Sequence, residues 1–487
     1  MKGWYLYMVR LNLSINKDLK ESYYIQIYKQ IKKQILNTTI KEGDKLPSIR
    51  QVAIKLDINQ NTVIQSYHLL EEKGFINKIS GKGCFVAKIS DFKIEQKEIA
   101  LIESFKYGQK EKNGIDFYNG TPAYEYFPIK QFEQFTKEVI SECGGEIFQY
   151  QSVQGVDSLR EILAEDLERD GIFVTKDRIQ ITSGTQQALD IIIKLFTKDR
   201  KPTVVLSSPT YPNALNIFKD CCNIKDMDIK KDGWDLDEFE KLLKEEKIDF
   251  IYEVINYQNP TGVIWSLEKR ERLLKLSKEY NFYIIEDDSF SEFYYTDEKP
   301  ELLKSLDKIG EEKIIYIKTF SKILMPGIGL ALMVVPENLL ENILLVKYGL
   351  DTTTSGLNQK ILEKFIKTKE LENHLLNIRE IFKKKKELMF ELLKRIQNLE
   401  IMHIPEGGFF IWVKLADCID GEKFYKECKE NGVFLLPGSV FYSDRRDACK
   451  IRLSFISPSL KEIIKGIGII EHLLLLSVIE NSKTCGN

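Results

Sequence analysis

The sequence predicts two folded parts of different classes: a small α+β unit at the N-terminus and a large α/β domain that ends in a small α+β subdomain. Apolar residues follow a helical period up to about residue 70 and then two short strand patterns. From about residue 115, apolar strands alternate with helices, which indicates a mainly parallel central sheet covered on both faces. Charge also divides the chain, because residues 1–88 hold 15 Lys and Arg against 7 Asp and Glu, whereas the whole chain has a net charge of -2.

The N-terminal unit is predicted to contain three helices and a hairpin. Tyr24–Asn37 carries isoleucines at helical spacing. Ser48 is a suitable N-cap for a second helix, and Asn59 for a third helix that Gly74 ends. Two short strands are predicted around a glycine pair, at Phe75–Ser80 and Cys84–Ala87. Three helices followed by a glycine-tipped hairpin describe a winged helix-turn-helix.

DNA is the partner that this arrangement favours. In a helix-turn-helix the third helix enters the major groove, and residues near its start reach the base edges. The basic balance of residues 1–88 suits a polyanion. The residues expected to face DNA are Ser48, Arg50, Asn59, Gln60, Asn61, Thr62 and, on the hairpin, Lys82. A small helical unit with an ordinary polar surface is the alternative that the pattern alone leaves open.

Four stretches of this unit carry a family pattern: Leu46–Ala53, Asn61–Val63, Tyr67–Ile76 and Gly81–Val86. Together they make residues 22–87 closely resemble the GntR family of bacterial regulators. The family usually has Ser-Arg before Asn-Thr-Val, where this chain has Asn59-Gln60. Because Arg favours guanine and Gln favours adenine, we expect a changed base preference.

A connector and a large domain follow residues 1–87. Residues 88–113 mix charged and apolar residues without a convincing period and are predicted to be a linker. Residues 114–487 form the large domain, with helices such as Thr185–Phe196 and Leu267–Tyr280 between its strands. The predicted strands are Ile179–Thr182, Thr203–Ser207, Phe250–Glu253, Tyr283–Glu286 and Ile314–Ile317. Functional groups are expected beyond the ends of these strands.

Five short motifs lie at those strand ends. Ser183–Gln187, where a strand becomes a helix, offers backbone N–H groups to a phosphate. Tyr211 can stack on a ring, Asn259 can donate a hydrogen bond, Asp287 can hold a ring proton, and Lys322 carries an amine. Each motif alone has an ordinary alternative, such as a helix cap, a core tyrosine or a surface acid. Their order along the chain supplies the groups that pyridoxal 5'-phosphate (PLP) needs.

The ordered series resembles the fold-type I PLP enzymes of the aspartate aminotransferase superfamily, over about residues 115–475. The resemblance implies that Lys322 forms a Schiff base with PLP, that Asp287 pairs with the ring nitrogen, and that Tyr211 stacks on the ring. It implies that Asn259 donates to the phenolic oxygen and that Arg452 takes a ligand α-carboxylate as a bidentate pair. The phosphate-binding residues that it implies are Gly184, Thr185, Gln186, Thr319, Ser321 and, toward the neighbouring subunit, Tyr150.

Two departures from the family pattern concern the same site. Family members usually have a second phosphate-binding arginine seven residues after the lysine, where this chain has Gly329. We expect weaker cofactor binding, with Lys318 as a partial replacement for that charge. Ser289 stands where the family has a tyrosine that tunes the lysine linkage.

The domain order as a whole resembles the MocR subfamily of transcription regulators. That resemblance implies a homodimer, arranged head-to-tail, whose aminotransferase-like domain senses PLP or an amino compound as effector. Weak transaminase activity is compatible with it, although the primary role is regulatory. Two alternatives remain open: a working aminotransferase with a DNA-binding appendage, and a regulator that has lost PLP.

Other kinds of site are not favoured. The eight cysteines are scattered without a C-x-x-C motif and the four histidines lie far apart, so neither a disulfide framework nor a metal site is expected. A reducing cytoplasm suits this cysteine usage. No stretch approaches the ~18 consecutive apolar residues of a membrane span, so no membrane partner is expected.

Overall fold

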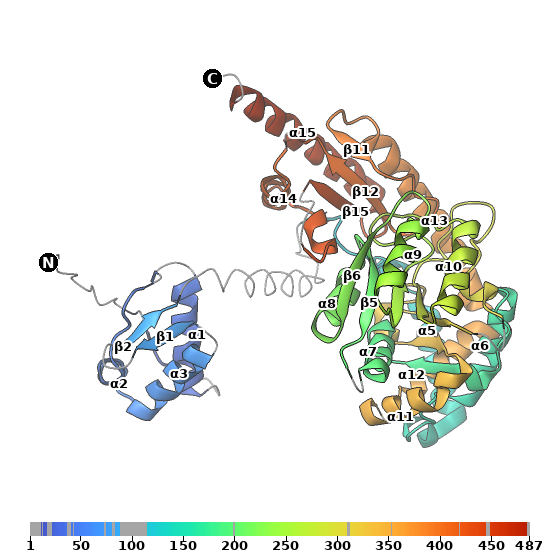
Figure 1. The fold of residues 1–487 in the computed structure, drawn as a ribbon, viewed down its shortest axis with the longest axis horizontal. Coiled ribbons are helices and arrows are strands. Elements are labelled where there is room, and N and C mark those ends of the chain that lie inside the picture. Colours follow the sequence, from blue (N-terminus) through green and yellow to red (C-terminus); the bar gives the residue numbers. More distant parts are fainter. Residues whose placement is uncertain are drawn as a thin grey trace. The chain divides into compact units, whose positions relative to one another are not determined.

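The computed structural model divides the chain into two compact units, Met1–Gln109 and Lys110–Asn487, which Figure 1 shows as ribbons. The residues that it describes are 11, 13–16, 22–36, 40–41, 43–72, 75–79, 83–87, 114–197, 200–308, 312–351, 353–417, 419–444 and 449–484.

The first unit has the predicted three helices and antiparallel hairpin. These elements are α1 (Tyr23–Leu36), α2 (Ile49–Leu56), α3 (Gln60–Glu72), β1 (Ile76–Ile79) and β2 (Gly83–Val86). Ser48 caps α2 through a capping box, because its side chain accepts from the Gln51 amide while the Gln51 side chain accepts from the Ser48 amide. Asn59 accepts from the Asn61 amide at the start of α3. The winged helix-turn-helix prediction is confirmed.

A single apolar core holds these elements together. Ile27, Ile31, Val63 and Leu70 are fully buried between the helices. Tyr67 on α3 donates a 2.8 Å hydrogen bond from its hydroxyl to the Pro47 carbonyl, just ahead of α2. This bond ties the middle of α3 to the chain just ahead of α2, and so helps to hold the two helices of the helix-turn-helix together.

The second unit is built on a seven-stranded sheet with the order β4-β10-β9-β8-β7-β5-β6. Its strands are β4 (Ile179–Thr182), β10 (Ala331–Val334), β9 (Ile314–Thr319), β8 (Tyr283–Asp288), β7 (Phe250–Glu253), β5 (Thr203–Ser208) and β6 (Asn223–Asp228). All neighbouring pairs are parallel except the two that β10 makes. The predicted mainly parallel sheet is confirmed.

Helices surround this sheet (Figure 1). They are α5 (Ile129–Cys143), α6 (Asp157–Arg169), α7 (Thr185–Phe196), α8 (Pro212–Cys221), α9 (Leu236–Glu245), α10 (Leu267–Glu279), α11 (Leu340–Leu350) and α12 (Gly356–Lys367). α7 packs on β4, β9 and β10, while α12 packs on α5 and α6. All six residues of β5 and of β9 are buried, as expected for central strands covered on both faces.

A smaller subdomain follows at the C-terminal end, with the antiparallel sheet order β11-β12-β15-β14. Its elements are α13 (Glu370–Leu393), β11 (Leu399–Ile401), β12 (Phe410–Leu415), α14 (Gly421–Glu430), β13 (Val433–Phe434), β14 (Leu436–Pro437), β15 (Lys450–Ser454) and α15 (Leu460–Thr484). The first strand of the unit, β3 (Ile115–Asp116), pairs with β13. The start of the large unit is therefore part of this subdomain. Among the described residues, no helix has the length and apolar character needed to cross a membrane.

Candidate functional site

The five predicted motifs lie at one edge of the central sheet. Because β4, β5, β7, β8 and β9 run in the same direction, their carboxyl ends meet there. Gly184 follows β4, Tyr211 follows β5, Asn259 follows β7, Asp287 ends β8, and Lys322 follows β9. The topology thus brings residues from five separate segments, between positions 184 and 322, to one edge of the sheet.

Lys322 has an amine that is held by backbone and hydroxyl oxygens. Its Nζ donates to the Gly120 carbonyl at 2.7 Å and to Thr121 Oγ1 at 3.4 Å. Burial of the ammonium lowers the pKa of Lys322 to about 8, and the positive charge of Arg452 acts in the same direction. About a tenth of this amine is therefore neutral, and nucleophilic, at pH 7, far more than for an exposed lysine.

Asp287 lies beneath the same site with its carboxylate fully hydrogen-bonded. Oδ2 accepts from the Tyr252 hydroxyl at 2.7 Å, and Oδ1 accepts from the Ser289 hydroxyl at 2.7 Å. Burial raises the pKa of Asp287, which these hydrogen bonds and the charge of Lys322 counteract. Ser289 occupies the position of the family tyrosine and is directed to Asp287. Tyr252 was not predicted, since a tyrosine inside a strand carries no sign of its partner.

Arg452 on β15 enters the site from the small subdomain. Its Nη1 donates to Asn259 Oδ1 at 3.0 Å, and its Nη2 donates to the Tyr118 carbonyl. The guanidinium carbon lies 3.9 Å from the centre of the Phe410 ring, and burial lowers the pKa of Arg452 to about 9. Nε is buried without a hydrogen-bond partner, and no carboxylate of a described residue forms an ion pair with this cation. A buried cation in this state is suited to an anionic ligand group.

Tyr211 stands at the start of α8 with a half-buried ring. Its hydroxyl accepts from Asn213 Nδ2 at 2.9 Å. Burial raises the pKa of Tyr211 to about 12, and the charge of Asp287 adds to this while Arg452 opposes it. The charges of Asp287 and Arg452 thus both act on the Tyr211 hydroxyl.

The residues predicted to bind phosphate within one chain, which form the predicted phosphate cup, lie around the turn at Gly184 and at the end of β9. Gly184 has φ +90°, and a Cβ built on it would meet no atom within 4 Å, so the space above the start of α7 is open. Thr182 and Thr319 are both paired with Ala331, which places the Gly184 turn and the start of the Thr319–Lys322 segment at the same edge. Ser321 donates its amide to Thr319 Oγ1 at 3.3 Å. Thr185 is half-buried and Gln186 is exposed.

Neither of the two positions considered for a second phosphate-binding cation directs one to this cup. Gly329 carries no side chain; it has φ +57°, with no atom within 4 Å of a built Cβ. Lys318 points elsewhere, because its Nζ lies 2.7 Å from Glu292 and 3.7 Å from Asp170, and these two charges raise its pKa. The expectation that Lys318 partly replaces the arginine is therefore wrong: β9 directs that side chain into a buried ion-pair cluster. Asp351 adds a carboxylate near the cup, accepting from Ser183 Oγ at 3.5 Å.

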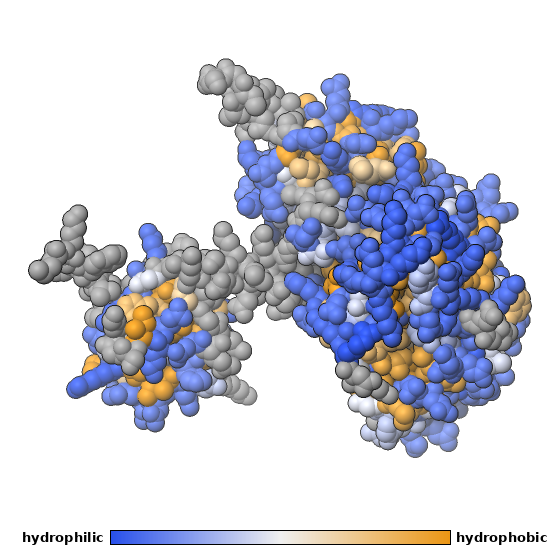
Figure 2. Space-filling view, viewed as in Figure 1, coloured by the Kyte–Doolittle hydropathy of each residue, from blue (hydrophilic) through white to orange (hydrophobic). Residues whose placement is uncertain are grey.

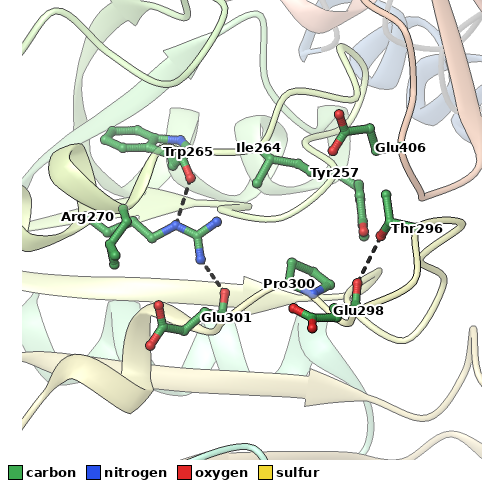
Figure 3. Close-up of a pocket in the computed structure, with 10 residues that line it drawn as sticks. Tyr257, Ile264, Trp265, Arg270, Thr296, Glu298, Pro300, Glu301 and Glu406 are labelled. Carbon is green, nitrogen blue, oxygen red and sulfur yellow. Dashed lines mark hydrogen bonds between the residues drawn. The ribbon is translucent and has the colours of Figure 1, made fainter.

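The loop that carries Asn259 is supported from behind by a buried arginine (Figure 3). Arg270 donates to Asn256 Oδ1 and to the Trp265 carbonyl, both at 2.8 Å, and to the Glu301 carbonyl. It lines a cavity of about 280 Å³ together with Tyr257. Two of these hydrogen bonds go to the loop that carries Asn259, and the third joins it to Glu301, so one rigid guanidinium restrains the loop.

The remaining predicted residues lie outside this cluster. Tyr150 is 83% exposed in the single chain, and its predicted contact with a neighbouring subunit stays a prediction. In the first unit, Ser48, Arg50, Asn59, Gln60 and Asn61 are exposed and Thr62 is half-buried, all at the beginnings of α2 and α3. Lys82 lies outside the described residues. No group of three or more His, Cys, Asp or Glu among the described residues is arranged to hold a metal ion.

The residues present fit PLP. The open turn at Gly184 has room for a phosphate group. The lowered pKa of Lys322 leaves part of its amine neutral and able to react with the aldehyde carbon of PLP. The carboxylate of Asp287 can accept a hydrogen bond from a protonated ring nitrogen. The unpartnered Nε of Arg452 suits the carboxylate of an amino acid.

Comparisons with known proteins agree with this fit. Residues 113–466 match the aminotransferase class I and II family, and residues 23–86 match the gntR family of bacterial regulatory proteins. The chain is 28% identical to the uncharacterized HTH-type transcriptional regulator YdfD of Bacillus subtilis, over 91% of this chain and 94% of that protein. It is 27% identical to the HTH-type transcriptional regulator NorG of Staphylococcus aureus, over 86% of this chain and 97% of that one. A solved structure of Pyrococcus horikoshii kynurenine aminotransferase with PMP has a TM-score of 0.72 at 31% identity, covering 77% of this chain and 94% of its own.

Proposed function

The chain belongs to the aminotransferase class I and II family and carries a GntR-family domain ahead of it, and we propose that it regulates transcription by sensing an amino compound through PLP. The observation that carries this proposal is that both matches lie in one chain whose relatives over nearly its whole length are named transcriptional regulators. This domain order is that of the MocR subfamily. The DNA-binding surface is assigned to the starts of α2 and α3, where Arg50, Asn59 and Gln60 are exposed.

The cofactor is held by the residues at the carboxyl edge of the sheet. Lys322 is the covalent attachment point, Asp287 keeps a proton at the ring nitrogen, and Tyr211 covers one face of the ring. When bound, PLP supplies an electrophilic carbon for amines and an electron-withdrawing ring. The effector class that fits is a primary amine bearing a carboxylate, since the buried Arg452 has no carboxylate partner among the described residues.

One segment connects this site to the region that precedes it in the chain. Lys322 donates to the Gly120 carbonyl and Arg452 donates to the Tyr118 carbonyl, so both ligand-binding cations also hold residues 118–121. Attachment of PLP to Lys322 would take away N–H donors that now hold Gly120 and Thr121, and a ligand carboxylate would compete for Arg452. Ligand binding therefore changes both attachments of a segment that begins five residues after the predicted linker. The ligand would therefore bind with different affinity to the arrangement in which residues 118–121 are held and to the one in which they are released. Such a difference in affinity is what coupling between ligand binding and DNA binding requires.

The functional form that we propose is a head-to-tail homodimer. Tyr150 is 83% exposed, and on α11 Leu345 and Tyr348 are 70% and 63% exposed. Figure 2 shows hydrophobic surface in the region where Figure 1 places α7 and α11. Exposed apolar side chains of this size are typical of subunit interfaces, and aminotransferase-type folds are commonly dimeric.

A working aminotransferase is the second candidate, favoured by the presence of Lys322, Asp287 and Arg452 in one site. Two observations argue for a low rate. Ser289 donates to Asp287 and offers no phenol to the lysine, and Gly329 leaves the cup without its usual cation. Orientation supplies much of such catalysis, and a small misplacement costs about a hundredfold.

The proposal is tested by titrating operator DNA with the full chain and with the chain lacking residues 1–88, each with and without PLP. The full chain should bind DNA and develop the visible absorbance of lysine-bound PLP, whereas the shortened chain should show only the absorbance. Unchanged DNA affinity in the shortened chain would exclude the regulator assignment. If the full chain bound DNA but showed no absorbance of lysine-bound PLP, the remaining interpretation would be a regulator that has lost PLP.

A further inference from the structure

Lys347 on α11 is a buried cation that the site described above does not use. Its side chain is 1% exposed. Nζ donates to two backbone carbonyls, those of Val153 and Ile181, which are distant in sequence from α11 and from each other. No carboxylate of a described residue forms an ion pair with it, although the charge of Asp351, one helical turn away, acts on it.

The two carbonyls belong to the two segments that are assigned to the phosphate. Val153 lies three residues after Tyr150, in the turn that presents this tyrosine to a neighbouring subunit. Ile181 lies on β4, three residues before Gly184. The Ile181 amide also donates to the Gln154 carbonyl at 2.8 Å, so the turn and the strand are joined on both sides of Ile181.

A purely structural role does not account for a lysine here. Removing an ammonium from water is costly, and a well-packed apolar side chain at such a position is usually neutral or stabilising. Burial lowers the pKa of Lys347 to about 8, and the charge of Arg160 acts in the same direction. The cation is present despite this cost, at a position on α11 from which it reaches both segments.

We propose that Lys347 is a positioning residue for the phosphate of PLP: its ammonium fastens the turn that carries Tyr150 to the strand that leads into the Gly184 cup. The inference rests on the proposed binding of PLP. Gly329 provides no cation, so among the groups assigned to the phosphate the amides at the start of α7 and the tyrosine of a neighbouring subunit gain importance beside Thr319 and Ser321. The first two of these groups lie on segments that Lys347 joins.

The test compares PLP with pyridoxal, which has the same reactive carbonyl but no phosphate. Lys347→Met should weaken PLP binding to the full-length protein by about tenfold, the loss expected for charge-assisted hydrogen bonds, with pyridoxal binding unchanged. Dissociation constants are read from the visible absorbance. Lys385→Met is the matched control, because Lys385 is also a buried helical lysine, with Nζ 2.7 Å from the Ile456 carbonyl and a pKa lowered to about 8. It should leave the ratio of PLP to pyridoxal affinity at the wild-type value.

The assignment would be overturned if Lys347→Met weakened the binding of PLP and of pyridoxal equally or weakened neither, because the ratio of the two affinities would then stay at the wild-type value. Should Lys347→Met fail to fold, Lys347→Gln replaces it, since glutamine removes the charge but keeps a polar group, and the same tenfold change in ratio is expected. Lys347→Arg keeps the charge and its donors and should keep the ratio near that of the wild type. A wild-type protein that binds neither ligand would contradict the proposed function itself, which this design separates from failure of the Lys347 assignment.

Discussion

Arg452 donates a 3.0 Å hydrogen bond from Nη1 to Oδ1 of Asn259, joining the small subdomain to a loop of the large one. The contact uses the oxygen of the Asn259 amide, which leaves Nδ2 as the group of this side chain that can donate to a cofactor. The residue assigned to the ligand carboxylate thereby orients the residue assigned to the phenolic oxygen of PLP. A ligand carboxylate at Arg452 and a cofactor oxygen at Asn259 would therefore influence each other through this hydrogen bond.

Arg452→Lys should selectively weaken ligands that carry a carboxylate. A lysine keeps the charge but cannot make the bidentate contact, and the loss should be about 1.5–3 kcal/mol, or one to two decades in affinity. The measurement is a titration of the PLP-loaded protein with an amino acid and with the corresponding amine that lacks the carboxylate. The amine should bind wild type and variant alike. Equal weakening of both would show that Arg452 acts through Asn259 or the fold rather than on the carboxylate.

Covalent capture of PLP should depend on pH with a midpoint near 8. The pKa of Lys322 is lowered to about 8, so its neutral, reactive fraction rises by about ninetyfold between pH 6 and 9 and then levels off. The rate is followed by stopped-flow absorbance, with N-acetyl-lysine in the same buffers as the reference for an unburied amine. Lys322→Ala should give no such phase. A rate that keeps rising tenfold per pH unit up to pH 10 would contradict the buried site for this amine.

Gly329→Arg should tighten PLP binding relative to Gly329→Ala. Both variants bear the cost of a side chain at φ +57°, roughly 1 kcal/mol or more, and both have open space at Cβ. Only the arginine restores a cation, whose contact with phosphate is worth about 1.5–3 kcal/mol. The expected difference in dissociation constant between the two variants is therefore one to two decades. Equal constants would mean that the phosphate does not lie near residue 329.

DNA binding should respond differently to two exposed residues of the first unit. Arg50→Ala should weaken binding broadly across sequences, whereas Gln60→Ala, at the start of α3, should change base preference by about 1–3 kcal/mol at one position. Selection from a randomised DNA pool measures both effects. Lys29→Ala, on α1, removes one charge elsewhere and serves as the control. An unaltered preferred sequence in Gln60→Ala would exclude the predicted recognition contact.

The arrangement of elements was largely predictable because the sequence signals it locally. The predicted strand Phe250–Glu253 and helix Thr185–Phe196 have the observed bounds, and β8 and β9 run only two residues longer than predicted. Apolar periodicity and turn residues carry this information. The antiparallel β10 was missed because its place between β4 and β9 depends on pairing with strands far away in sequence.

Side-chain partners were not predictable in the same way. Lys318 was expected at the phosphate, yet the pleat of β9 directs it to Glu292 and Asp170. Lys347 was not predicted to have a role, because a lysine on a helix is usually solvated. Only the fold brings the Val153 and Ile181 carbonyls to it. Lys322, Asp287 and Asn259 were identified through their ordered motifs, whereas Tyr252 and the carbonyls of Tyr118 and Gly120 have no motif.

The central claim, that the aminotransferase-like domain senses a ligand and controls DNA binding, is tested most directly by one paired measurement. Operator affinity of the PLP-loaded full chain is measured against a panel of amino acids, and transamination of the same panel is followed in parallel. The account predicts that one ligand or a small group shifts operator affinity, that Lys322→Ala and Arg452→Lys remove the shift, and that turnover is slow or absent. Turnover in the usual enzyme range of about 1–10³ s⁻¹, with no ligand changing DNA affinity, would contradict it and establish the protein as an aminotransferase.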